Sequence, residues 1–136
     1  MENRNIKFHE IPKWGSYLRG KWEVFFASHL SKAEKEAIYL KSFLWHLCSW
    51  GKVDCYEKFE AIKMFEEQNK LKCLIFYENT DEAYLIEDAK QLLIEALPYE
   101  QIHMDYGDIY VMDWYGKWTF MMTHESECGP YFIKNY

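Results

Sequence analysis

The last third of the chain carries an alternation of apolar side chains that strongly constrains the fold. Residues 109–114 and 117–124 flank Tyr115-Gly116, a pair typical of the tight turn in a β-hairpin. With a two-residue turn, successive side chains lie on opposite faces of the hairpin. One face carries Ile109, Val111, Asp113, Trp118, Phe120, Met122 and His124, and the other carries Tyr110, Met112, Trp114, Thr119, Met121 and Thr123. Because both faces are partly apolar, either helices cover both sides or the second face is an exposed aromatic surface that binds something else.

Two further apolar regions predict additional strands. Residues 73–77 and 83–86 have β-type composition and are separated by the polar loop 78–82, which suits a hairpin. Residues 131–133 follow Gly129-Pro130 and predict a final short strand. Neighbouring strands in the sequence favour an antiparallel sheet over an alternating parallel one.

Helical spacing predicts two helices in the first third of the chain. One apolar face is formed by Trp14, Leu18, Trp22, Phe25 and His29. Ser31 and Glu34 have the spacing of a capping box, in which each side chain binds the backbone amide of the other residue. The second helix is therefore expected from Lys32 to about Lys41.

Two more helices are expected after residue 50. Phe59, Ile62 and Phe65 recur at helical spacing within residues 56–68. A further apolar stripe over residues 88–97 predicts a helix that begins at Asp88 and stops at Pro98. The apolar stretch 43–50 fits either a helix or a buried strand, and Gly51 ends it in both cases.

These elements predict an α+β fold in which an antiparallel sheet of about four to five strands packs against about four helices. The chain has 136 residues, of which 49% are hydrophobic, which is enough to bury one core. We therefore expect residues 1–136 to form a single domain.

Charge and hydropathy exclude several classes of partner. The net charge is −6, and lysines are interleaved with glutamates rather than gathered on one face, so no nucleic-acid partner is expected. The longest apolar runs, 43–48 and 73–77, fall short of the roughly 20 residues of a membrane helix, so no membrane partner is expected. The amino end lacks the pattern of an export signal, which favours the cytoplasm and reduced thiols for the four cysteines. We expect a monomer or a small homo-oligomer.

The chain lacks familiar catalytic and cofactor motifs. Its six glycines are scattered, so glycine-rich phosphate loops are absent, and no nucleophile elbow or His-Glu-x-x-His helix occurs. We expect no cofactor. Soft metal ligands occur only as weak candidates, because their spacing matches no standard zinc site. These candidates are His46, Cys48, His124 and Cys128.

The acidic and aromatic last third is the best candidate for a binding surface. Rigid aromatic side chains mixed with carboxylates can anchor a basic protein partner. The competing interpretation is that the aromatic residues form core and the loop carboxylates are solvated. The candidate binding residues are Asp105, Asp108, Tyr110, Asp113, Trp114, Tyr115 and Glu125.

Several short motifs resemble a known family. They are Phe43-Leu44-Trp45-His46, Gly51-Lys52-Val53 with Cys55, Ile75-Phe76-Tyr77, Trp118-Thr119-Phe120, Thr123-His124-Glu125 and Gly129-Pro130-Tyr131-Phe132. In combination they resemble a family of short, uncharacterised bacterial proteins classed only as a domain of unknown function, over about residues 14–134. The resemblance implies a bacterial cytoplasmic setting and carries no catalytic role. The last three motifs are also similar in flavour to small acidic immunity proteins that neutralise bacterial toxins, which is an analogy alone.

The sequence leaves two functional hypotheses and a blander alternative. The first is a non-enzymatic protein-binding module, immunity-like or regulatory, with Tyr110, Met112 and Trp114 exposed on the sheet. The second is a metal-binding or thiol-dependent enzyme, which requires His46, Cys48, His124 and Cys128 to converge in one cleft. In the third, these residues only build the core and the functional surface lies elsewhere.

Overall fold

The computed structural model describes residues 6–98, 108–125 and 127–135. The fold is α+β, and the described strands form one seven-stranded antiparallel sheet in the order β1-β4-β3-β5-β6-β7-β2. The strands are β1 (His9–Glu10), β2 (Tyr56–Glu57), β3 (Cys73–Tyr77), β4 (Ala83–Ile86), β5 (Ile109–Asp113), β6 (Trp118–Met122) and β7 (Tyr131–Lys134). The described helices are α1 (Gly15–Phe26), α2 (Lys32–Ala37), α3 (His46–Ser49), α4 (Lys58–Glu67) and the short 3₁₀ helix η2 (Ile94–Ala96).

The central strands are buried on both faces, which is one of the two alternatives that the sequence leaves open. β5 pairs with β6 so that Ile109 lies opposite Met122 and Met112 lies opposite Thr119, which is the register of the expected hairpin. Ile109, Val111 and Phe120 join one hydrophobic core. Tyr110, Met112 and Met121 join the other. The predicted assignment of these side chains to two faces is therefore confirmed.

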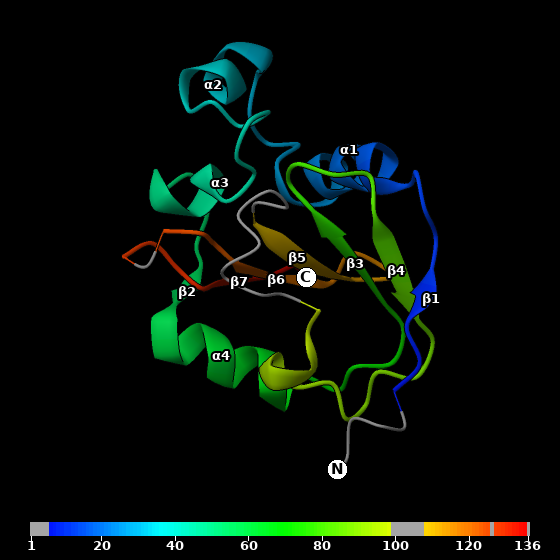
Figure 1. Cartoon of the computed structure of the whole chain (residues 1–136). Coiled ribbons are helices and arrows are strands. Elements are labelled where there is room, and N and C mark those ends of the chain that lie inside the picture. The colour runs from blue at the N-terminus through cyan, green and yellow to red at the C-terminus, as the bar shows by residue number, and fades with distance from the viewer. Residues whose placement is uncertain (1–5, 99–107, 126, 136) are drawn as a thin grey trace.

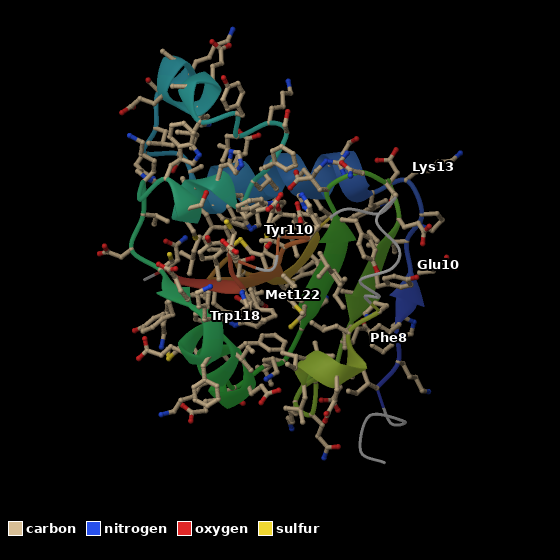
Figure 2. The ribbon with its side chains drawn as sticks, turned by 60° about the vertical axis from the view of Figure 1, so that its left-hand side comes forward. Phe8, Glu10, Lys13, Tyr110, Trp118 and Met122 are labelled. Atoms are coloured by element: carbon tan, nitrogen blue, oxygen red, sulfur yellow. The ribbon has the colours of Figure 1, made fainter. Side chains whose placement is uncertain are left out.

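Helices cover the two faces of the sheet. Figure 1 shows α1 and α3 on one side of the sheet and α4 on the other, with α2 farthest from the strands. In Figure 2, Tyr110 lies on the side of α1, whereas Trp118 and Met122 lie on the side of α4. The sheet is thus the middle layer of three.

Helix α1 is fixed by one buried face, by a hydrogen bond to β6 and by a close backbone contact at its first residue. Leu18, Trp22 and Phe26 are buried at helical spacing, and the Trp22 indole N–H donates a 2.9 Å hydrogen bond to the Thr119 hydroxyl of β6. At the start of the helix, a Cβ on Gly15 would lie 2.6 Å from the Thr80 carbonyl oxygen, so only glycine fits there. α1 therefore crosses the sheet from the β3–β4 loop toward the β5–β6 turn.

The capping box at Ser31 and the helix expected within residues 56–68 are both present in the structure. The Ser31 hydroxyl accepts from the Glu34 amide at 3.1 Å, and the Glu34 carboxylate accepts from the Ser31 amide at 2.8 Å. This cap starts α2, which ends at Ala37, earlier than expected. α4 occupies most of the range expected for the third helix and buries Phe65. The ambiguous stretch 43–50 contains a helix, α3.

The number of strands was underestimated because β1 and β2 are too short to show a period. Each has two residues, and all of them are exposed. β1 pairs only with β4, and β2 pairs with β7, so these strands extend the two edges of the sheet. Their pairing comes from tertiary contact rather than from an apolar pattern.

The helix expected over residues 88–97 is wrong, since only the short η2 forms there. Ala89 and Leu92 are buried as expected, but the Ala89 amide donates to the Leu71 carbonyl oxygen at 2.8 Å. Leu93 is extended, with φ −116° and ψ 167°, and the Ile94 amide donates to the Glu66 carboxylate at 3.3 Å. These bonds to other parts of the fold replace the i to i−4 bonds of a helix.

Among the residues that the structure describes, no helix has both the length and the apolar character needed to cross a membrane.

Replacing Trp22 tests the layer formed by α1. Trp22→Phe removes a fully buried indole ring and its hydrogen bond to Thr119. We expect a loss of about 2 kcal/mol in the free energy of unfolding, measured by urea denaturation. Val24→Ala on the exposed face of the same helix is the control, and we expect it to change stability by less than about 0.5 kcal/mol.

Candidate functional site

The structure distributes the candidate binding residues over three places. Asp108 and Tyr110 are fully buried. Trp114 is half-buried at the β5–β6 turn, and Tyr115, in the same turn, is 72% exposed. Glu125 is exposed at the end of β6. Asp105 lies outside the described residues.

The expected exposed sheet face is wrong for two of its three residues. Tyr110 and Met112 have no exposed surface, because they pack in the same core as Leu18 and Trp22 of α1. Only Trp114, beyond the end of β5, retains exposed surface. The interior of this sheet face therefore cannot contact a partner protein.

A polar cluster occupies one edge of the sheet. β3 and β6 end there and β5 begins there, because Tyr77 pairs with Ile109 and Ile109 pairs with Met122. The residues just beyond these pairs are Glu78, Asp108 and the Thr123–His124 pair. The antiparallel register thus gathers two carboxylates and a histidine from separate parts of the chain.

Asp108 is held by three hydrogen-bond donors. Its Oδ2 accepts from the Trp45 indole N–H at 2.6 Å. Its Oδ1 lies 2.6 Å from the His124 amide nitrogen and 2.8 Å from His124 Nδ1. His124 Nε2 lies 3.3 Å from the exposed Glu125 carboxylate. Asp108 therefore fixes the orientation of both Trp45 and His124.

Glu78 is the second buried carboxyl group of the cluster. Its Oε1 accepts from the Tyr110 hydroxyl and from the Leu44 amide. Burial raises the pKa of Glu78 to about 8, and these two hydrogen bonds only partly oppose that effect. Burial likewise raises the pKa of Tyr110 well above its ordinary value. At neutral pH, Glu78 is therefore mainly protonated.

The same cluster attaches the segment before α3 to the sheet. The Leu44 amide binds Glu78, the Trp45 amide binds the Tyr110 hydroxyl at 3.1 Å, and the Trp45 indole binds Asp108. Glu78 Oε2 is buried and has no hydrogen-bond partner among the described residues. Three hydrogen bonds of this cluster thus position the segment that leads into α3, which is a structural role.

The weak metal candidates do not form a ligand set. Among the described residues, no group of three or more His, Cys, Asp or Glu side chains could hold a metal ion. His46 Nδ1 lies 2.6 Å from the Ile38 carbonyl oxygen, and His124 binds Asp108. Cys48 is buried beside Cys55, and burial raises its pKa, whereas Cys128 is half-buried. The described part of the chain therefore offers no set of three ligands for the metal hypothesis.

An exposed surface on α1 joins the β5–β6 turn. We call it the α1–turn surface, and it consists of Trp14, Tyr17, Lys21, Val24, Phe25, Lys72, Trp114 and Tyr115. Trp14, Tyr17 and Trp114 line a cavity of about 140 Å³ above Leu74 of β3. Tyr17, Val24 and Phe25 line an adjoining groove of about 470 Å³ along α1.

The β5–β6 turn is held rigidly against α1. Asp113 accepts from the Tyr115 and Lys117 amides, both at 3.1 Å. Gly116 has φ +74°, and its missing side chain makes room for the Phe25 ring, which a Cβ would approach to 2.4 Å. The aromatic side chains of the turn and of α1 therefore form one continuous, preorganised surface.

Two lysines lie within this surface. Lys72 Nζ is 3.9 Å from the centroid of the Trp114 ring. Lys21 Nζ is 5.7 Å from the Tyr17 ring centroid and 5.6 Å from that of Phe25. These distances fit cation–π contacts, which hold the ammonium groups among the aromatic rings.

Sequence reasoning missed both Glu78 and most of the α1–turn surface. Glu78 was placed in a polar loop, and nothing in the sequence separates it from its solvated neighbours. The α1 residues did carry a signal, because Trp14, Tyr17, Lys21 and Val24 follow helical spacing. That stripe flanks the buried face of the helix rather than coinciding with it.

The comparisons with known proteins agree with the resemblance in the sequence. A family model described as "Domain of unknown function (DUF4275)" matches residues 1–132. The chain belongs to the DUF4275 family. No curated protein and no solved structure matches the chain. Membership of DUF4275 assigns no activity to either site, so the functional argument depends on the geometry.

Glu78 should make stability depend on pH. The folded chain keeps the Glu78 proton up to about pH 8, whereas the ordinary value is 4.5. The stabilisation is fully present below pH 4.5 and is lost as the pH rises through this window to about 8. Glu78→Gln removes the titration, so its stability relative to the natural chain should increase by up to about 1.4 kcal/mol per pH unit within the window.

Urea unfolding at about pH 5 and about pH 9 measures this difference. Glu60→Gln, an exposed change on α4, is the matched control and should leave the pH dependence unaltered. Equal pH dependence of Glu78→Gln and the natural chain would show that Glu78 ionises normally.

Proposed function

We propose that the chain is a non-enzymatic protein-binding module that contacts its partner through the α1–turn surface. The observation that carries this proposal is the gathering of exposed aromatic side chains on one rigid surface. Tyr17 is 56% exposed, Trp14 is 43% exposed and Tyr115 is 72% exposed. Tyrosine and tryptophan dominate the residues that contribute most to protein–protein binding.

The geometry of this surface supports a protein ligand. The cavity beneath Trp14 and Trp114, of about 140 Å³, has room for one apolar side chain, and the adjoining groove of about 470 Å³ extends the contact along α1. Because Phe25 packs on Gly116, the β5–β6 turn is held against α1 before a partner binds. Preorganised anchors of this kind favour affinity.

The polar cluster at the sheet edge is a weaker candidate for a binding surface than the α1–turn surface, because its polar groups are bonded within the fold. The Asp108 carboxylate accepts from the Trp45 indole, and the Glu78 carboxyl group accepts from the Tyr110 hydroxyl. Tyr110 is fully buried. Both ring nitrogens of His124 lie beside carboxylates, those of Asp108 and Glu125. The engagement of these groups within the fold favours the α1–turn surface as the binding site.

We extend the proposal to a bacterial, cytoplasmic setting and an immunity-like or regulatory role. The net charge of −6 and the exposed aromatic residues fit such a protein. If a neighbouring gene encodes a toxin, production of this chain should restore growth of cells that express that toxin. Unchanged growth would contradict the immunity-like role and leave a regulatory role in place.

The binding function is tested by site-specific photo-crosslinking in cells. A photoreactive amino acid placed at Tyr115 should capture a partner, because this side chain projects from the α1–turn surface. The same amino acid at Phe59 on α4 is the matched control, since Phe59 is 77% exposed on the opposite side of the sheet (Figure 1). The captured partner is identified, purified and measured by titration calorimetry.

With the purified partner, we expect Tyr17→Ala to weaken binding at least about tenfold and Phe59→Ala to leave the affinity unchanged. Circular dichroism of each variant checks that it folds. A partner captured equally at both positions, or an affinity that Tyr17→Ala leaves unaltered, would argue against the α1–turn surface.

A further inference from the structure

The glycine in the middle of α1 is not required by any contact with the described residues. Gly20 is exposed within the helix Gly15–Phe26. A Cβ on Gly20 would meet nothing within 4 Å, whereas a Cβ on Gly15 would collide with the Thr80 backbone. A glycine inside a helix is less stable than alanine, because its backbone loses more freedom on folding. The packing of the described residues therefore gives no reason for glycine at position 20.

Gly20 lies in the groove of the α1–turn surface. Tyr17 and Val24 stand on the same outer side of the helix and line this groove with Gly20, Ser16, Lys21 and Phe25. Val24 is 67% exposed although it is apolar. Because Gly20 has no side chain, the backbone of a second molecule can approach α1 closely between Tyr17 and Val24. Close packing on a helix of this kind suits another helix, whose side-chain ridges fit into the groove.

The charges around the groove are locally positive. Lys21 and Lys72 lie among aromatic rings, and within the described part of the chain neither pairs with a carboxylate.

Two of the nearby carboxylates, those of Glu23 and Asp81, are paired with cations. Glu23 lies 3.4 Å from Lys35, Asp81 lies 3.7 Å from Arg19, and Asp113 binds the amides of its own turn. Charges farther away than a Debye length, about 10 Å at 0.1 M salt, are largely screened. The net charge of −6 therefore does not prevent an acidic ligand from binding this surface.

We propose that the occupant of the α1–turn surface is an amphipathic helix of another protein, with an apolar face flanked by Asp and Glu. Its backbone passes over Gly20, and one apolar side chain enters the cavity between Trp14 and Trp114. Its carboxylates pair with Lys21 and Lys72. This inference rests on the proposed function, since it names the partner of the same surface.

The first test uses a phage-displayed library of random peptides about 20 residues long. Such a peptide forms a helix of about 30 Å, which is longer than the 12-residue α1 and can cover its whole length. Peptides are selected on the full chain, and each retained peptide is then measured on Gly20→Gln, which fills the groove. We expect the retained peptides to have apolar residues at spacings of three and four, with Asp and Glu beside them. A synthetic peptide from this set should bind the natural chain at least about tenfold more tightly than it binds Gly20→Gln.

Variants of the groove separate binding from folding. Glutamine and alanine favour helix more than glycine does, so Gly20→Gln and Gly20→Ala should melt at a higher temperature than the natural chain while binding the peptide more weakly. Lys21→Ala and Lys72→Ala should each lower the affinity about threefold to tenfold and reduce its dependence on salt. Phe59→Ala, on the other side of the sheet, is the control and should have no effect.

The outcomes distinguish this inference from the proposed function. Basic peptides, or peptides without helical spacing, that still lose affinity with Tyr17→Ala would overturn the acidic helix and leave a protein-binding surface. Peptides that bind equally to the natural chain, Gly20→Gln and Tyr17→Ala would overturn both proposals.

Discussion

Burial of the central strands on both faces is the constraint on which the structure depends. β3, β5 and β6 lie in the middle of the sheet and present apolar side chains above and below it. A sheet of this kind is stable only when both faces are removed from water. α1 and α3 therefore cover one face and α4 the other, and the connections between them follow from this requirement.

The polar cluster at the sheet edge follows from the same arrangement. α3 is a short helix and cannot be held by its own backbone hydrogen bonds. Glu78, Tyr110 and Asp108 supply the missing attachment through the backbone of residues 44–45 and the Trp45 indole. Because these groups are buried, Glu78 holds its proton to about pH 8. The structure thus places these ionisable groups where a helix is joined to the sheet, which gives them a structural role.

Helix α1 serves the core and the surface at once. Its inner face buries Leu18, Trp22 and Phe26, which fixes the position of the whole helix. Its outer flank then presents Tyr17 beside Trp114 in a fixed geometry. The rigidity of the α1–turn surface is therefore a consequence of core packing. The exposed Gly20 in the same helix leaves room for a second molecule to approach.

The sequence by itself determined the α+β class, the β5–β6 register, the capping box of α2 and the range of α4. These features depend on local periodicity or on contacts between residues close in the chain, so one segment contains the information. The tertiary structure decided the edge strands β1 and β2, the loss of the helix over residues 88–97 and the burial of Tyr110 and Asp108. Each of these depends on hydrogen bonds or packing between segments far apart in the sequence, such as Ala89 with Leu71 and Trp45 with Asp108. The α1–turn surface combines both kinds of information, because helical spacing produces the stripe on α1 and only the folded sheet brings Trp114 beside it.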